Sequence, residues 1–408
     1  MSFPLNTYRF KNGIRLIHSQ NQSPVAHFGL IVQTGTRDEK LEEHGMAHFM
    51  EHMFFKGTGK RSAYQIISRL EDVGGEINAY TTKEETALYA SFLKEDYRRA
   101  MELIRDIFLN STFPEKEMEK EREVILNEIQ SYDDSPAELI FDRAEEILFP
   151  DHAIGRNILG SENSLKSFRR DHFFRFLEEN YSSETLVLSF TGNTPFEQVV
   201  KTAEAYFGSI PARTRQQGRR KPMAASAVRI REKRDTYQKH CMLIGEGYAL
   251  TDERRLGLYL LNNILGGPGL NSRLNLALRE RHGYSYSAES HYAPYLDTGA
   301  IMIYFSCDPD KFQPSLKVCR EELSKLRTRL IPESKLHNFR KQMIGQLAIS
   351  RENNEHFMLT SGKNFLIFNR MASLKEIWKH LEAISPQQIR DTANEVLNYK
   401  MLNQLIFE

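Results

Sequence analysis

The order of elements predicted for residues 86–130 is repeated at residues 299–347. In each segment a strand is followed by a helix, a short break and a second helix. The break reads Phe-Pro-Glu in the first copy and Ile-Pro-Glu in the second, and proline disfavours helix at the residue before it. Upstream, a Gly-rich turn and an amphipathic helix at 55–70 parallel those at 264–279. The sequence therefore predicts an internal duplication.

Each half combines strands with long helices, which predicts two homologous α+β domains. Apolar and polar residues alternate at 184–192, as in a strand, and strands separated by runs of helices favour α+β over a strictly alternating α/β fold. A chain of 408 residues, 40% hydrophobic and 27% charged, suits two globular domains. We expect a first domain at 1–210, a linker at 211–235 and a second domain at 236–408.

The expected linker carries clustered arginine and lysine together with proline, glycine and small residues. Such a cluster is typical of a solvated connector, and the alternative is a basic arm that binds nucleic acid or lipid headgroups. The formal net charge of +1 argues against a polyanion-binding surface over the whole molecule. We therefore expect no nucleic-acid partner.

Cysteine usage and hydropathy bear on the compartment. The cysteines, Cys241, Cys307 and Cys319, are odd in number and all lie in the second half, so no disulfide framework is predicted. The first residues show no basic region followed by an apolar run, and no stretch of about 18 apolar residues follows. The sequence predicts a cytoplasmic protein without a membrane segment.

The segment HGMAHFMEHM contains the pattern H-x-x-E-H at His48, Glu51 and His52. Histidines four apart lie on one face of a helix, close enough to bind one zinc ion, and the glutamate is placed to act as general base toward a water molecule. His44 has the same spacing, but no carboxylate lies between it and His48, so we expect His44 at or before the helix start and outside the site. With 13 histidines in the chain the pattern can arise by chance, so a third ligand is required.

The helix predicted at 115–132 places two glutamates on its apolar face. Met118 and Ile125 mark this face at a spacing of one heptad, and Glu121 and Glu128 occupy the positions between and beyond them. Carboxylates in core positions are costly to bury unless they are paired or bind metal. The two lie about 10 Å apart along the helix axis, so one can be a metal ligand while the other supports the site.

The stretches EEHGMAHFMEHMFFKGTGKR and EREVILNEI resemble the M16 (pitrilysin-type) zinc metallopeptidases, in particular the two-domain subfamily related to mitochondrial processing peptidase. The resemblance covers nearly the whole chain, including the duplication. It implies that zinc is held by His48, His52 and Glu128, with Glu121 as the supporting glutamate and Glu51 as the general base. The second half has no H-x-x-E-H, so we expect one zinc ion per chain.

The resemblance also implies a way of binding substrate. In the family, the stretch that matches Asn78, Ala79 and Tyr80 is an exposed edge strand to which the substrate peptide adds as another strand. Such an edge recognises extended peptide through main-chain hydrogen bonds, so it accepts many sequences. The alternative is an ordinary core hairpin.

In the second half, LRERHGYSYSAES resembles the Arg/Tyr element of the family. The resemblance implies that Arg279 holds a substrate carbonyl and that Tyr286 donates a hydrogen bond to the oxyanion of the tetrahedral intermediate. Tyr284 is an alternative donor. Without the zinc motif, an exposed arginine and a packed tyrosine would be the simpler interpretation.

The resemblance implies a zinc endopeptidase that acts on peptides or unfolded polypeptide. In the family, two halves of a clamshell, each made of two such domains, enclose a chamber, and the Arg/Tyr element comes from the half opposite the zinc. This chain corresponds to one half and carries both elements, so we expect a homodimer with active sites completed in trans. The alternatives are a non-catalytic scaffold subunit of the same fold and an obligate heterodimer whose partner supplies the Arg/Tyr element.

Overall fold

The computed structural model describes residues 5–215 and 218–408, so residues 216 and 217 of the expected linker lie outside the described residues. The contacts divide the chain into two compact units, each assembled from three separate segments. The first unit consists of Met1–Ile129, Ile158–Arg219 and Ala348–Ser373, and the second of Gln130–Asn157, Arg220–Leu347 and Leu374–Glu408.

The first unit is built on a sheet with the order β1-β2-β6-β3-β5-β4. β2 and β6 run parallel, and the other neighbours are antiparallel. β4 therefore forms an outer edge of this sheet in the described part of the chain. The strands are β1 (Leu5–Arg9), β2 (Arg15–Gln20), β3 (Val25–Val32), β4 (Glu76–Thr81), β5 (Thr86–Leu93) and β6 (Leu186–Gly192).

The second unit repeats this topology. Its sheet has the order β7-β11-β8-β10-β9, which matches β2-β6-β3-β5-β4, and its one parallel pair among the described strands, β7 with β11, stands where β2 and β6 stand in the first sheet. The duplication and the two α+β domains predicted from the sequence are thereby confirmed. The strands are β7 (Arg229–Glu232), β8 (Lys239–Glu246), β9 (Ser287–Pro294), β10 (Gly299–Cys307) and β11 (Asn403–Phe407).

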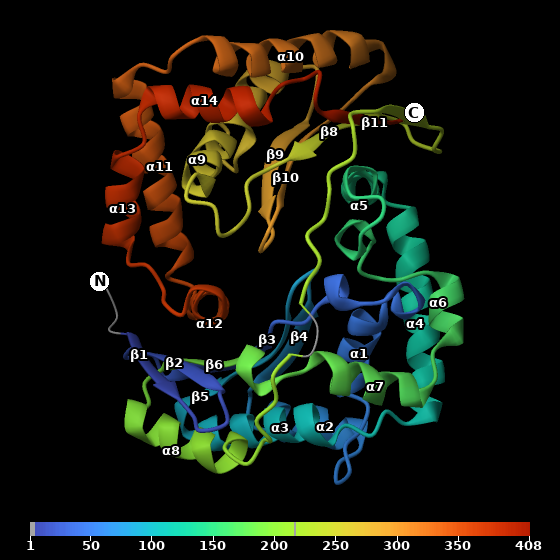
Figure 1. Ribbon diagram of the computed structural model, residues 1–408, viewed down its shortest axis with the longest axis vertical. Coiled ribbons are helices and arrows are strands. Elements are labelled where there is room, and N and C mark those ends of the chain that lie inside the picture. Colours follow the sequence, from blue (N-terminus) through green and yellow to red (C-terminus); the bar gives the residue numbers. More distant parts are fainter. Residues whose placement is uncertain (1–4, 216–217) are drawn as a thin grey trace. The chain divides into compact units, whose positions relative to one another are not determined.

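Helices cover both faces of the first sheet. Along β3, Leu30 and Val32 point into the larger core beneath α1, α3 and α8, while Ile31 points to the other face, where it joins a small core with Phe365 of α12. Figure 1 shows α12 on one side of this sheet and α3 and α8 on the other. The helices are α1 (Met46–Phe54), α2 (Ala63–Glu71), α3 (Tyr97–Asn110), α4 (Glu115–Asp133), α6 (Glu162–Ser167), α7 (Arg170–Asn180), α8 (Phe196–Phe207) and α12 (Asn354–Phe368).

The second sheet is covered in the same way. One face packs against α9, α10 and α14, and the other packs against α5, where Ile140 and Leu148 contact the core that contains Met242 and Ile244. The thiols Cys241, Cys307 and Cys319 are buried and form no disulfide. The helical elements are α5 (Pro136–Leu148), α9 (Arg255–Gly266), the π-helical segment η6 (Asn275–Glu280), α10 (Phe312–Thr328), α11 (Glu333–Ser350), α13 (Leu374–Glu382) and α14 (Pro386–Val396).

The two repeats exchange one helix each. α5 precedes the end of the first repeat but packs on the second sheet, and α12 belongs to the second repeat but packs on the first sheet. This division differs from the continuous domains expected at 1–210 and 236–408, because the apolar face of a helix does not specify which of two similar sheets it covers. The expected linker is also partly ordered, since residues 229–232 form β7.

None of the helices in the described parts of the chain combines enough length with enough apolar character to cross a bilayer.

Candidate metal centre

Helix α1 carries the H-x-x-E-H pattern with its chemistry facing away from the core. Its apolar residues, including Phe49, Met50 and Met53, are fully buried, whereas the histidines and Glu51 are half-buried. The apolar face therefore fixes the rotation of the helix. As a result the rings of His48 and His52 lie side by side, with centroids 4.7 Å apart.

Helix α4 brings the third donor. Met118, Glu121 and Ile125 form its buried face, and Glu128 follows on the same side, two turns beyond Glu121. An oxygen of the Glu128 carboxylate lies 3.8 Å from Nε2 of His48 and 3.7 Å from Nε2 of His52. One donor atom from each of these three residues lies within 4.8 Å of the other two.

This donor set fits zinc. Two imidazole nitrogens and a carboxylate oxygen are ligands that zinc prefers, and two ligands of a tetrahedral zinc ion lie about 3.3 to 3.5 Å apart, close to the separations found here. These separations are too long for hydrogen bonds, so the three groups converge without satisfying one another. Burial, followed by the neighbouring His52, lowers the pKa of His48 to about 3. His48 is therefore neutral at physiological pH, the form that binds metal.

Glu121 orients one ligand. Its carboxylate lies 3.1 Å from Nδ1 of His52, and its other oxygen lies 2.6 Å from Nζ of Lys56. An acceptor at Nδ1 keeps the proton on that nitrogen and leaves Nε2 of His52 to face Glu128. The sequence predicted this supporting role for Glu121 but did not identify Lys56, which lies one turn after His52.

Glu51 lies on α1 beside His52 and is not part of the converging donor set. Burial, with the nearby carboxylate of Glu128, raises the pKa of Glu51. Hydrogen bonds from Thr81 and the charge of His52 act in the opposite direction but do not cancel this, so the pKa of Glu51 lies above its ordinary value. A carboxylate with a raised pKa is suited to accept a proton and then release it.

The strand β4 carries Asn78, Ala79 and Tyr80 along the outer edge of the sheet, beside α1. Asn78 is exposed, and the hydroxyl of Thr81 donates a hydrogen bond of 3.4 Å to the carbonyl of Ala47 in α1. Tyr80 is held by a hydrogen bond of 3.1 Å from its hydroxyl to Glu85. Among the described residues, the open edge of β4 and the metal-binding helix are thus neighbours.

A family model described as insulinase (peptidase family M16) matches residues 15–162, and one described as peptidase M16 inactive domain matches residues 167–343. An uncharacterized zinc protease of Bacillus subtilis is 34% identical over 96% of this chain and 95% of the relative. The chain belongs to peptidase family M16.

A further relative and two solved structures are also similar to this M16 chain. An uncharacterized zinc protease of Rickettsia bellii is 32% identical over 98% of this chain and 97% of the relative. A crystal structure of a protease from Helicobacter pylori, 18% identical, superimposes with a TM-score of 0.92 over 100% of both chains. The peptidase M16 inactive domain from Pseudomonas fluorescens, 17% identical, has a TM-score of 0.91 over 99% of this chain and 98% of that chain. The two solved structures share the fold.

The Arg/Tyr element of this M16 chain lies in the second unit. Arg279 belongs to the π-helical segment η6, and its guanidinium lies 3.7 Å from Glu280. Tyr286 is 83% exposed, directly before β9, while Tyr284 is half-buried and stacks on His282. The three metal-site donors all lie in the first unit, so the contacts of a single unit do not bring Arg279 or Tyr286 to them.

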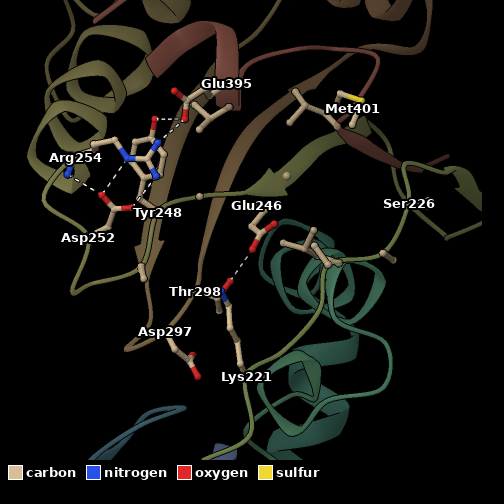
Figure 2. Close-up of a pocket in the computed structure, with 18 residues that line it drawn as sticks. Lys221, Ser226, Glu246, Tyr248, Asp252, Arg254, Asp297, Thr298, Glu395 and Met401 are labelled. Atoms are coloured by element: carbon tan, nitrogen blue, oxygen red, sulfur yellow. Dashed lines mark hydrogen bonds and ion pairs between the residues drawn. The ribbon is translucent and has the colours of Figure 1, made fainter. Parts of the chain in front are cut away.

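Figure 2 shows a pocket of about 590 Å³ in the second unit, and none of the predicted site residues lines it. Within it, Arg254 forms ion pairs with Asp252 at 2.8 Å and with Glu395 at 2.8 Å. The hydroxyl of Tyr248 donates to the same Glu395 at 2.8 Å. The candidate metal centre and this pocket are therefore separate features.

Proposed function

We propose that this M16 chain is a zinc-dependent endopeptidase that hydrolyses peptides or unfolded segments of polypeptide. The observation that carries the proposal is the convergence of His48, His52 and Glu128 within 4.8 Å, with Glu51 beside them on the same helix. The zinc protease names of the relatives from Bacillus subtilis and Rickettsia bellii support it.

Glu51 performs the proton transfers in the proposed reaction. A bound zinc ion supplies a Lewis acid that polarises the scissile carbonyl and lowers the pKa of a water molecule. Glu51 accepts a proton from that water and delivers it to the nitrogen of the departing amine. Its raised pKa favours the first of these transfers, because a more basic carboxylate takes the proton from the water more readily.

The substrate lies along β4 in this proposal. An extended peptide can hydrogen-bond to the backbone groups that face outward along the edge formed by Asn78, Ala79 and Tyr80, and thus place a peptide bond beside α1. Main-chain recognition requires the peptide to be extended, which favours unfolded segments over folded domains. Thr81 then links the strand that binds substrate to the helix that carries the ligands.

The remaining groups come from a second copy of the chain. Tyr286 donates a hydrogen bond to the oxyanion and Arg279 holds a substrate carbonyl, and the two act on the zinc site of the partner in a cytoplasmic homodimer that encloses a chamber. The exposure of Tyr286 supports this role, because its hydroxyl is accessible to a group outside its own unit.

Subunit mixing tests this arrangement. Glu51→Gln removes the general base and should lower kcat by about 100- to 10,000-fold, with zinc content unchanged. Tyr286→Phe removes the oxyanion donor and should lower kcat by about 100-fold. Mixed dimers of the two variants should regain activity at one of their two sites, measured as cleavage of a quenched fluorescent peptide after subunit exchange.

Two outcomes would contradict the proposal. Full activity of the Glu51→Gln variant would point to a scaffold whose apparent cleavage comes from a contaminant. Mixed dimers that remain as inactive as their parents, although exchange is verified by mass, would show that the active sites are not completed in trans.

A further inference from the structure

The connection from β3 to α1 contains two short 3-10 helices, Thr36–Asp38 and Leu41–Glu43, and ends at Gly45. Gly45 has φ +91°, and a Cβ atom there would approach Cα of Gly160 to 2.6 Å. Only glycine fits this position, so the start of α1 is closely fixed against the neighbouring backbone.

Glu39 caps the metal-binding helix. One oxygen of its carboxylate accepts a hydrogen bond of 2.9 Å from the backbone N–H of Gly45, and the other accepts one of 2.9 Å from Ala47. Glu39 is only 5% exposed. A buried carboxylate at the first N–H groups of a helix satisfies donors that the helix leaves unbonded and opposes the positive end of its dipole.

Asp38, the residue before Glu39, is held by arginines of the expected linker, residues 211–235. Asp38 accepts two hydrogen bonds from Arg219, of 3.0 Å and 2.8 Å, and further hydrogen bonds from Arg215 and from the backbone of Gly35. Arg219 also donates to the carbonyl of Glu84 at 2.7 Å. The side chains of Asp38 and Arg219 are 1% and 7% exposed. The pair is therefore shielded from solvent and has a single bidentate geometry.

The charge state of Asp38 agrees with this role. Burial acts to raise its pKa, but the hydrogen bonds and charge of Arg219, the charge of Arg215 and the Gly35 N–H outweigh burial, so the pKa lies below its usual value. Asp38 stays ionised at neutral pH. Arg219 is the last residue of the first unit before the chain continues into the second.

We infer that Arg219 is a positioning residue for the metal centre: it fixes Asp38, the adjoining Glu39 caps α1, and α1 presents His48, Glu51 and His52. The ionic contact between Arg219 and Asp38 then both supports the metal-binding helix and anchors the expected linker. The inference rests on the proposed function for its activity measurement, whereas its metal-affinity and amide-exchange measurements require only that the site binds zinc.

Arg219→Gln tests the inference, with Arg213→Gln as a matched control, because Arg213 is an exposed arginine of the same connector. Three quantities are measured: zinc affinity by competition with a chromogenic chelator, hydrogen exchange of the peptide spanning residues 39–54, and kcat and KM for a quenched peptide. For Arg219→Gln we expect about tenfold weaker zinc binding, as for a group that orients ligands indirectly, with faster exchange in 39–54 and a lower kcat at unchanged KM. Arg213→Gln should match the wild type in all three.

A double variant keeps the test decisive if Arg219→Gln folds poorly. Asp38→Asn combined with Arg219→Gln removes both charges of the Asp38–Arg219 pair. Its zinc affinity should equal that of Arg219→Gln alone, because both residues act along one path. Zinc affinity and amide exchange that match the Arg213→Gln control, or additive losses in the double variant, would overturn the inference. A wild type that binds zinc but cleaves no peptide would instead contradict the proposed function.

Discussion

The helix pair α1 and α4 in the first unit and the pair α9 and α11 in the second unit show what separates a metal site from its copy. Both α4 and α11 begin at a Pro-Glu pair, and counting from the proline aligns Glu121 with Phe339 and Glu128 with Gln346. The second unit therefore has an aromatic ring and a neutral amide where the first has two carboxylates.

The contacts between the helices differ accordingly. In the second unit the amide of Asn263 on α9 donates to the amide oxygen of Gln346 on α11 at 2.6 Å, so these two side chains are joined directly by a hydrogen bond. In the first unit Glu128 and the two histidines stop 3.7 to 3.8 Å apart. Two amides can pair directly as donor and acceptor, whereas a carboxylate oxygen and two imidazole nitrogens that converge with their lone pairs are joined by a cation. The same fold can thus keep or lose a metal site through a few side chains.

The largest expected effect comes from replacing Glu128 with the residue found at the equivalent position of the second unit. Glu128→Gln places the residue of position 346 at the third ligand and should weaken zinc binding by at least about 100-fold, because loss of a ligand exceeds the usual effect of losing a supporting group. The measurement is zinc per chain by mass spectrometry after dialysis against a chelator.

The reverse exchange is the matched control. Gln346→Glu adds a carboxylate to α11, but α9 offers no histidine pair in its LYLLNNIL segment, so zinc per chain should not rise. A second zinc ion per chain in Gln346→Glu, or one zinc ion per chain in Glu128→Gln, would contradict the proposed difference between the two helix pairs.

A smaller effect is expected from the buried charges beside the metal-binding helix. The pKa of Asp38 in the folded chain lies below its ordinary value of 3.8, so the folded state binds the proton less tightly than the unfolded chain. The contribution of Asp38 is complete above pH 3.8 and is lost as the pH falls through the folded-state pKa. Asp38→Asn should therefore lower the free energy of unfolding by about 2 kcal/mol at pH 7, and this difference should shrink below pH 3.8 in urea denaturation. A difference that grows with acid would have the wrong sign.

The smallest effect is expected in the second unit. Asn263→Ala leaves the half-buried amide of Gln346 without this donor and should lower the free energy of unfolding by about 1 kcal/mol, with zinc content unchanged. Since neither amide titrates, this loss should be the same at pH 7 and at acidic pH, in contrast to Asp38→Asn. Loss of zinc in Asn263→Ala would show that the two helix pairs are not independent.

The sequence was sufficient for the parts of the site that follow local periodicity. His48 and His52 share a helix face by spacing alone, and Glu121 and Glu128 stand out as carboxylates on an apolar stripe. The duplication was visible because each repeat keeps its order of elements. These features depend on residues within a few turns of one another.

Other features depend on contacts between distant segments. Glu39 caps α1 from a loop. Nothing in the sequence distinguishes it from the other acidic residues around it. Arg219 lies in a cluster whose composition is typical of a solvated connector, yet it is buried against Asp38. The exchange of α5 and α12 was equally hidden, because either helix has an apolar face that suits either sheet.

Anomalous diffraction at the zinc edge from crystals of the zinc-loaded chain tests the central claim most directly. The account predicts one peak per chain, within bonding distance of Nε2 of His48, Nε2 of His52 and a carboxylate oxygen of Glu128, and no peak between α9 and α11. No peak at the three donors, or a peak between α9 and α11 in their place, would contradict it.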